Sequence, residues 1–471
     1  MKCAAIGTWG GKLMALAIFV LLTRLLPVEA IGAISLIAVY LALLQLIGEA
    51  GLAEYLVQHQ ERDAVQEQSL FWLQLLLSSL AAAVLWLAAP LVTASMPQSV
   101  PAESLVHWMC LSLPLVAAAR VPDALMRKSL SFKQLAYRNL VAALCGGIAG
   151  LVCAFQGFGV WALVVRQLVD NAVALIAVMI GARWRPQFVF SRSVLGAPLR
   201  YGLAVFGARS IAVIHGRADS LIVGWMLGAT ALGYYSVALR IYQIVSEMFN
   251  SVIDAVSVPL IARVKHDPES LRTVFLKLVR GSSLLSMSAY AMLCALAPLI
   301  ITLAFGAQWS SSGSVLRWLA LVGLITGPLW FNGGMLLATG QATRWMLVVS
   351  SYVIVGFILF PIAATMGGVV VVAMALVVRA LVMAPLSATV ALHAARIRAV
   401  DYCRAWLPSA AIGIGVGAFA WIASAVALAL EGRIIVAFVA GALAGAAFFV
   451  IVVRFGAPGI WRQATDMLKR R

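Results

Sequence analysis

Apolar stretches of about 20 residues recur along almost the whole chain and are separated by short polar connections. A helix of that length spans the hydrocarbon core of a bilayer and satisfies its own backbone hydrogen bonds there. Hydrophobic residues make up 63% of the 471 residues and charged residues 11%, whereas soluble domains have roughly half and a quarter. The sequence therefore predicts an all-α polytopic membrane protein. Its fourteen predicted spans cover residues 6–26, 31–50, 69–90, 104–122, 140–156, 160–182, 199–226, 234–258, 279–305, 314–338, 345–366, 369–393, 406–428 and 433–453.

Basic residues are concentrated in every second connection between these spans. The chain has 34 Lys and Arg against 17 Asp and Glu, which gives a formal net charge of +17. Most of the basic residues lie near residues 120–138, 183–200, 263–280 and 396–404 and at the two ends, whereas the alternate connections hold only Arg433. Cytoplasmic loops of membrane proteins carry such an excess. The pattern predicts that both termini are cytoplasmic, and we expect no nucleic-acid partner.

The sequence offers no motif for catalysis. The six cysteines are scattered, mostly in apolar runs, without a CxxC spacing. Neither a phosphate-binding glycine loop nor a spacing typical of metal ligands is present in the sequence. The outward loops are short and lack the acids and bases that a membrane enzyme would present there. We therefore expect no catalytic residue, no metal and no cofactor.

Two pairs of segments match between the first and second parts of the chain. Residues 26–35 and 227–236 share Leu, then Pro or Gly, then Ala-[Ile/Leu]-Gly and Ser, and ALVVR occurs at residues 162–166 and again at 375–379. These matches predict two six-helix halves in the same orientation, an architecture of transporters that handle substrate between the halves. The predicted divisions are an N-terminal lobe at 1–190, a C-terminal lobe at 191–398, and two further spans with a basic tail at 399–471.

Several basic residues fall inside the predicted spans. An arginine at the centre of a membrane helix costs roughly 2.5–3.5 kcal/mol on insertion scales, so we expect these residues to line an internal, water-filled cavity. Guanidinium groups suit the geometry of phosphate, and mutual ion pairing is the structural alternative. The residues predicted to contact an anionic ligand are Lys12, Arg24, Arg209, Arg217, Arg240 and Arg379.

A second set of charged residues inside the spans has two open interpretations, ion coupling or structural pairing. Arg166 and Asp170 are four residues apart on one helix face, which favours a mutual pair. Glu247 and Asp254 share a face of one span, and both proton or sodium coupling and structural pairing stay open for them. The full set is Glu49, Arg166, Asp170, Asp219, Glu247 and Asp254.

Residues 123–139 combine apolar and basic side chains in a way typical of a helix lying on the inner membrane surface. A basic loop that only marks the cytoplasmic side is the alternative.

Three parts of the chain carry a family resemblance. They are RLLPVEAIG at residues 24–32, the segment 122–136 followed by GFGVWAL at 157–163, and DSLIVG at 219–224 followed by LG at 227–228 and LGYY at 232–235. Together they resemble bacterial polysaccharide transporters, the Wzx-type oligosaccharide flippases, and in particular the branch that exports exopolysaccharide repeat units. The resemblance covers most of the chain. The family often has Asn before the position of Asp219, where this chain has Arg217 and Ala218.

The resemblance implies a V-shaped pair of six-helix lobes with an electropositive cavity and two extra C-terminal helices. It also implies a cargo, an oligosaccharide repeat unit linked through pyrophosphate to undecaprenol, which is flipped by alternating access from the cytoplasmic to the periplasmic leaflet of the bacterial inner membrane. A cation gradient is a candidate driving force. Expected partners are this cargo, membrane lipids and other polysaccharide assembly proteins, and we expect a monomer.

Two alternatives remain from the sequence. A multidrug exporter of the same superfamily would have a cavity dominated by carboxylates and twelve spans. A membrane-embedded polysaccharide polymerase or glycosyltransferase would place acids or bases on a sizeable outer loop.

Overall fold

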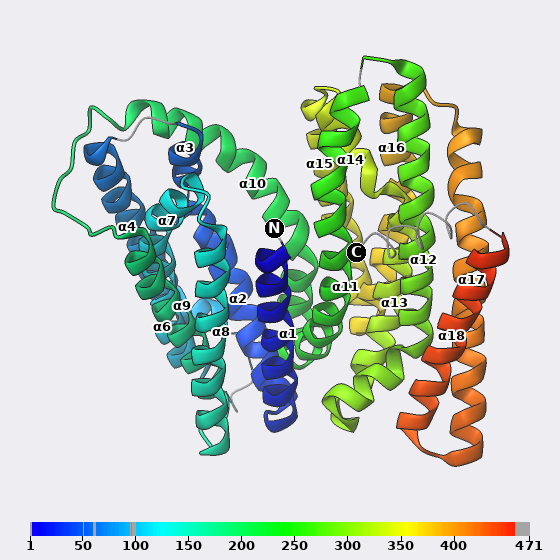
Figure 1. Cartoon of the computed structure of the whole chain (residues 1–471). Coiled ribbons are helices and arrows are strands. Elements are labelled where there is room, and N and C mark those ends of the chain that lie inside the picture. The colour runs from blue at the N-terminus through cyan, green and yellow to red at the C-terminus, as the bar shows by residue number, and fades with distance from the viewer. Residues whose placement is uncertain are drawn as a thin grey trace. The chain divides into compact units, whose positions relative to one another are not determined.

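The computed structural model describes residues 2–49, 51–59, 63–94, 96, 100–264 and 266–456, and every regular element within them is a helix (Figure 1). The prediction of an all-α polytopic membrane protein is therefore confirmed. By their contacts the residues divide into two compact units, residues 1–233 and 234–471.

The described residues of the first unit form ten α-helices and a short π-helix, and α11 (Gly228–Val264) starts at its end and continues into the second unit. Its helices are α1 (Lys2–Leu25), α2 (Val28–Glu49), α3 (Leu52–Gln58), α4 (Ala64–Leu87), α5 (Ala89–Thr93), α6 (Ala102–Cys110), α7 (Ser112–Lys128), α8 (Phe132–Phe155), α9 (Trp161–Ala182), α10 (Gly196–Ile222) and η1 (Val223–Leu227). Within it α8 packs against α1 and α9, α7 against α4 and α9, and α2 against α4 and α10.

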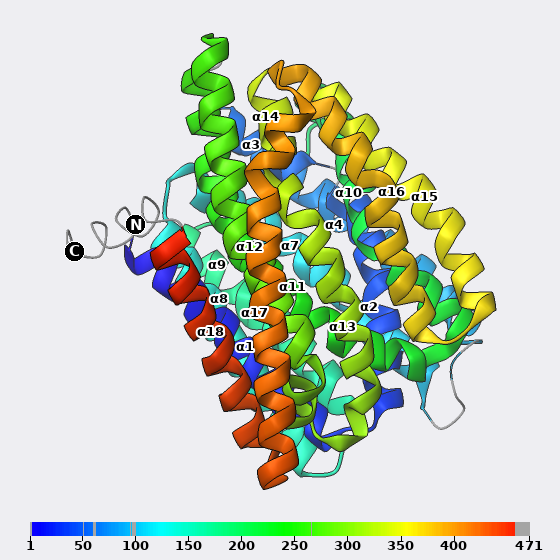
Figure 2. The same ribbon diagram turned by 90° about the vertical axis from the view of Figure 1, so that its right-hand side faces the viewer.

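The second unit is organised around α12, which packs against α13, α17 and α18 (Figure 2). The last two helices, which the sequence predicts as spans beyond the repeat, therefore belong to this unit. Its helices after α11 are α12 (Pro268–Phe305), η2 (Ala307–Trp309), α13 (Ser310–Thr326), η3 (Gly327–Leu329), α14 (Trp330–Ala338), α15 (Ala342–Met366), α16 (Val369–Ala395), α17 (Ala399–Glu431) and α18 (Ile434–Gly456).

Among the described residues, twelve helical segments are long and apolar enough to cross a membrane, against fourteen predicted spans. One difference arises because residues 196–251 count as a single segment, although the backbone departs from helical geometry inside it at Gly228, where φ is 83°. The other is α1, whose described apolar part is the short segment Met14–Leu25. Over its described residues, each of the fourteen predicted spans nevertheless lies mostly on helix, so the count is roughly consistent with the prediction.

The connection between α9 and α10 is held against the start of α4. Gln68 donates from Nε2 to the carbonyl of Arg185 at 3.0 Å and accepts the backbone N–H of Gln187 at 2.8 Å. Trp72 donates from Nε1 to the carbonyl of Gln187 at 2.7 Å, and its ring stacks on Phe188. These bonds satisfy the backbone of a segment without regular structure. They therefore define where α9 ends and α10 begins.

A buried tyrosine organises the core of the second unit. Tyr290 on α12 is fully buried, and its hydroxyl shares a 2.7 Å hydrogen bond with the hydroxyl of Ser246 on α11. Its ring lies 6.0 Å from both Phe249 and Trp330, measured between ring centroids. Aromatic contacts of this kind join α11, α12 and α14 in one apolar cluster.

The contact division falls at residue 233, and α10 packs on α2 and α3 within the first unit. The three-part division of the sequence, at residues 190 and 398, describes the repeat and stays a prediction.

The two hairpins related by the repeat contact each other through matched glycines. A Cβ atom on Gly32 would overlap the carbonyl oxygen of Ala229, and a Cβ on Gly233 would lie 2.5 Å from the carbonyl oxygen of Val28. Gly32 corresponds to Gly233 in the repeat, and Val28 corresponds to Ala229, so the contact is reciprocal. Each glycine allows the other hairpin's backbone to approach where any side chain would prevent it.

We predict that Gly32→Ala and Gly233→Ala each destabilise the protein. The added methyl group meets a backbone carbonyl, which cannot rotate away as a side chain could, and such overpacking costs typically about 1–3 kcal/mol. Gly216→Ala on α10 is the matched control, because its Cβ would meet nothing within 4 Å. Melting temperatures of the purified variants in detergent test this. Equal melting temperatures for all three variants and the wild type would contradict the close approach.

Candidate functional site

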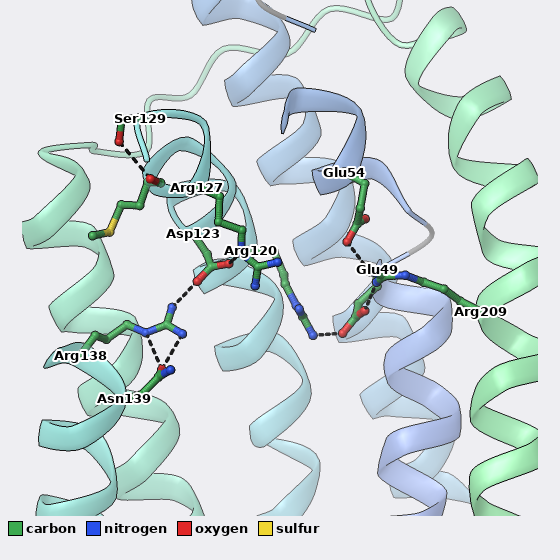
Figure 3. A network of polar contacts seen from close by, with 10 residues as sticks. Glu49, Glu54, Arg120, Asp123, Arg127, Ser129, Arg138, Asn139 and Arg209 are labelled. Carbon is green, nitrogen blue, oxygen red and sulfur yellow. Dashed lines mark hydrogen bonds and ion pairs between the residues drawn. The ribbon is translucent and has the colours of Figure 1, made fainter. Parts of the chain in front are cut away.

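The end of α2 and the short helix α3 bring two carboxylates to the side of α10. Gly51 between them adopts a left-handed conformation (φ 66°), and a Cβ there would lie 2.7 Å from the Cβ of Val205 on α10. The turn therefore fits closely against α10. Glu49 at the end of α2 and Glu54 on α3 consequently face Arg209 of α10 (Figure 3).

Glu49 links three helices through its two carboxylate oxygens. Arg209 Nη1 lies 3.0 Å from Glu49 Oε2, and Arg209 Nη2 lies 2.6 Å from Glu54 Oε1. The other oxygen of Glu49 accepts from Arg120 Nη2 of α7. The Glu49 side chain is 16% exposed, so α2, α7 and α10 meet at a shielded ion-pair network.

A second carboxylate joins α7 to α8. Asp123 Oδ2 lies 2.7 Å from Arg127 Nε, one turn later on α7, and Asp123 Oδ1 lies 2.5 Å from Arg138 Nη1 on α8. Arg138 also donates from Nε and Nη2 to the side-chain oxygen of Asn139, at 3.1 and 2.8 Å. The side chain of Asp123 is 9% exposed and that of Arg138 is 17% exposed. This pair is therefore among the more buried charges of the unit.

Two cavities flank this network, and they share Arg120, Asp123 and Arg127 in their walls. One has a volume of ≈ 200 Å³ and is also lined by Glu54, Tyr201 and Arg209. The other, of ≈ 250 Å³, lies between α7, α8 and α9. Guanidinium groups that line a cavity can bind a phosphate oxygen in place of a carboxylate. The carboxylate is planar and the phosphate tetrahedral, but the oxygens of both accept from the paired N–H groups of arginine.

Of the residues predicted from sequence, Arg209 and Glu49 are brought together directly. Asp170 lines the second cavity and interacts electrostatically with Arg166 and Arg138. At Arg166 and Asp170, α9 packs closely on α8. A Cβ atom added to Gly146 of α8 would lie 2.7 Å from the carbonyl oxygen of Arg166 and 2.9 Å from the Cβ of Asp170.

Other predicted residues of the first unit lie far from this network along their helices. Arg24 is in the last turn of α1, and Arg217 and Asp219 are in the last two turns of α10. Asp219 is buried and accepts from the Ser220 backbone N–H at 2.7 Å. These residues adjoin the repeat-related hairpins, whereas Glu49 is at the opposite end of α2.

In the second unit, Arg240 and Glu247 lie on α11 and are both partly buried. Arg379 on α16 lies over the aromatic rings of α15, with its guanidinium carbon 4.9 Å from the ring centroid of Phe360 and 5.9 Å from that of Tyr352. This contact is a cation–π interaction. The side chains of Lys12 and Asp254 lie outside the described residues.

Five charged members of the network are not among the predicted site residues: Glu54, Arg120, Asp123, Arg127 and Arg138. Three of them, Arg120, Arg127 and Arg138, belong to a segment that the charge pattern assigns to a cytoplasmic connection. A signal was available, because Arg120, Asp123 and Arg127 are spaced three and four apart, which places them on one helix face. Residues 123–139 do not form a separate surface helix: the segment is the end of α7 and the start of α8, joined by a short turn. The prediction of a helix lying on the inner membrane surface was wrong because α7 continues past Pro122 to Lys128.

Comparison with known proteins identifies the family. Residues 21–314 match the family described as polysaccharide biosynthesis protein. The chain belongs to this family. The family resemblance inferred from the sequence is thereby confirmed.

Three relatives have names that refer to polysaccharide biosynthesis. The chain is 29% identical over 318 residues to the succinoglycan biosynthesis transport protein ExoT of Rhizobium meliloti, with 67% of this chain and 63% of ExoT covered. It is 25% identical to the lipopolysaccharide biosynthesis protein WzxC of Escherichia coli (64% and 62% covered) and 26% identical to the amylovoran biosynthesis protein AmsL of Erwinia amylovora (64% and 79%). The alignments thus span less than two thirds of ExoT and WzxC.

Two solved structures are similar to this chain in fold. The lipid II flippase MurJ in an inward closed conformation matches with a TM-score of 0.76 at 13% identity, over 96% of this chain and 99% of MurJ. An inward-facing multidrug transporter of the MATE family matches with a TM-score of 0.64 at 16% identity, over 82% and 94%. At these identities the likeness establishes the fold alone. Family and fold together identify the chain as a multi-pass membrane protein of the polysaccharide biosynthesis family.

We predict that Asp123→Asn destabilises the protein, because it leaves Arg127 and the buried Arg138 without their carboxylate. Breaking a fully buried pair costs about 3–5 kcal/mol, and we expect roughly 1–3 kcal/mol here because Arg127 is half exposed. The double variant Asp123→Asn/Arg138→Gln should recover part of the loss, as interacting residues are not additive.

The matched control is Asp401→Asn, which breaks the more exposed Arg272–Asp401 pair at 2.6 Å. Exposed pairs contribute about 0–1 kcal/mol, so its melting temperature should stay near the wild-type value. Equal losses for Asp123→Asn and Asp401→Asn would show that the α7–α8 pair has no special role.

Proposed function

We propose that the chain is a flippase that moves undecaprenyl-pyrophosphate-linked oligosaccharide repeat units from the cytoplasmic to the periplasmic leaflet of the bacterial inner membrane. The observation that carries the proposal is the family match over residues 21–314. In this proposal both termini are cytoplasmic, and transport proceeds by alternating access.

The names of the relatives refer to different polysaccharides, so any feature that their cargoes share would not be the sugar. They refer to the biosynthesis of succinoglycan, teichuronic acid, lipopolysaccharide and amylovoran. Recognition shared by such proteins would have to use a part of the cargo that does not change with the polysaccharide. The pyrophosphate and the polyprenyl chain of a lipid carrier meet that requirement.

The charges of the chain suit that cargo. A pyrophosphate cannot enter hydrocarbon with its water, and protein donors must replace that water during crossing. Guanidinium groups do this with paired N–H donors at fixed geometry. The proposed contacts along the path are Lys12, Arg24, Arg209, Arg217, Arg240 and Arg379. The polyprenyl tail can stay in the surrounding lipid.

We predict that deletion of the gene causes lipid-linked oligosaccharide to accumulate in the cytoplasmic leaflet, and that the wild-type gene reverses this.

Arg209→Ala and Arg379→Ala should lower export by roughly tenfold or more, a loss of at least about 1.4 kcal/mol, because each removes a guanidinium proposed to face the cargo. Export is measured as surface polysaccharide at matched protein levels.

Arg433→Ala is the control, because Arg433 is exposed between α17 and α18. Arg209→Lys tests charge alone, since it keeps the ion pairs with Glu49 and Glu54 in reach. Normal export by both alanine variants would refute the anion pathway. A deletion strain without accumulated lipid-linked oligosaccharide would refute the flippase itself.

We include in the proposal that a proton or sodium gradient drives transport through Glu247 and Asp254 of α11. Glu247→Gln keeps the shape of the side chain and removes its charge, so flipping by the reconstituted variant should lose its response to an imposed gradient. A wild-type rate that is unchanged by either gradient would leave structural pairing as the role of Glu247.

A further inference from the structure

The cavity between α7, α8 and α9, here called the α7–α9 cavity, is lined mainly by polar side chains. Its volume is ≈ 250 Å³, whereas about 10–15 Å³ suffices for one water. It therefore has room for a polyatomic ion. The polar residues in its wall are Arg120, Asp123, Arg127, Arg138, Asn139, Asp170 and Asn171.

Two donors in this wall are buried without a hydrogen-bond partner among the residues that the structure describes. They are Nε of Arg120 on α7 and Nδ2 of Asn171 on α9. The side-chain oxygen of Asn171 is already used, because it accepts from Gln167 Nε2 at 3.3 Å. A buried donor without an acceptor is unfavourable, so an acceptor that enters the cavity can accept from both groups.

Positive charge is concentrated around the same cavity. Three arginines of like charge, Arg120, Arg127 and Arg138, line its wall. Each guanidinium has five N–H donors, and in the ion pairs Arg120 uses one nitrogen for Glu49 and Arg127 one nitrogen for Asp123. Donor capacity therefore remains on α7, on the side of the cavity.

The carboxylates in the wall are balanced by other arginines. Asp123 is held between Arg127 and Arg138, and Asp170 interacts with Arg166 and Arg138. The cavity wall itself holds three arginines, Arg120, Arg127 and Arg138, against two aspartates, Asp123 and Asp170. The arginines in the wall outnumber its carboxylates by one, which favours an anion.

We propose that the α7–α9 cavity is a phosphate-binding site, with Arg120 Nε and Asn171 Nδ2 as donors. A tetrahedral phosphate presents oxygens in several directions, which suits donors that approach from different helices, whereas a carboxylate accepts in one plane. The phosphate belongs either to the pyrophosphate of the lipid carrier or to a phospholipid headgroup. Only the first source rests on the proposed function.

The test is binding of inorganic pyrophosphate to the purified full-length protein, measured by calorimetry and by the shift in melting temperature. Asn171→Asp places a negative charge at the donor, and Arg120→Lys keeps the charge beside Glu49 but removes the Nε donor. Hydrogen bonds to charged groups contribute enough that we expect each variant to weaken binding roughly ten- to hundredfold.

The matched control is Gln156→Glu, the same change from amide to carboxylate at the far end of α8, where the side chain is exposed. It should bind pyrophosphate as the wild type does. Having two variants keeps the test decisive, because Arg120→Lys still reports on the site if Asn171→Asp does not fold.

The two possible sources of the phosphate, the lipid carrier and a phospholipid headgroup, are distinguished in nanodiscs. These contain undecaprenyl pyrophosphate, phosphatidylglycerol or phosphatidylcholine alone, and native mass spectrometry counts the lipid that stays bound to the protein. Retention of undecaprenyl pyrophosphate that Asn171→Asp abolishes supports the carrier as the source. Retention of phosphatidylglycerol with the same sensitivity supports the site with a phospholipid headgroup in it. Phosphatidylcholine serves as the lipid without net charge.

Pyrophosphate binding that is absent in the wild type, or equally strong in both folded variants, would overturn the site. That result leaves the export assay untouched, so failure of the site and failure of the flippase can be told apart. Conversely, a deletion strain that accumulates no lipid-linked oligosaccharide refutes the flippase while pyrophosphate binding can still be measured.

Discussion

The first unit depends on one carboxylate that serves two arginines. Glu49 binds Arg120 of α7 with one oxygen and Arg209 of α10 with the other, so a single side chain at the end of α2 ties three helices together. In a low-dielectric setting such a group is costly unless both of its oxygens are bonded. The turn at Gly51, which fits against α10, is what brings the carboxylate within reach of Arg209.

The helical architecture could be predicted from sequence because the bilayer allows few solutions: an apolar run of sufficient length must be a helix. The ion-pair network around Glu49 could not be predicted from the sequence. Glu49 and Arg209 were each flagged as charges inside spans, but 160 residues separate them, and no periodicity relates residues on different helices. Arg120, Arg127 and Arg138 were attributed to topology because charge counting cannot distinguish an arginine that marks a cytoplasmic loop from one that continues a helix into an ion pair.

The repeat was more informative than its short matching segments suggested. Glycines at corresponding positions, Gly32 and Gly233, each meet the backbone of the other hairpin. Each hairpin therefore keeps a glycine where it touches the other hairpin, which a comparison of apolar pentapeptides could not reveal. A contact made only of backbone atoms has no charge to desolvate and no side chain to reorder. It can form or separate at little cost in rotamer entropy.

The ion pairs also bear on how an anion could be released after binding. An arginine with no partner would hold a phosphate tightly inside a low-dielectric cavity, and a transporter must let its cargo go. Arginines that already have carboxylates hold a phosphate less tightly, because the carboxylates offset part of their positive charge. The proposed donors, Arg120 Nε and Asn171 Nδ2, lie outside the pairs that Glu49 and Asp123 make with Arg120 and Arg138, so these pairs need not break for an anion to bind or leave. The near balance of charge around the network is therefore suited to transient binding, whereas a simple excess of arginine would favour retention.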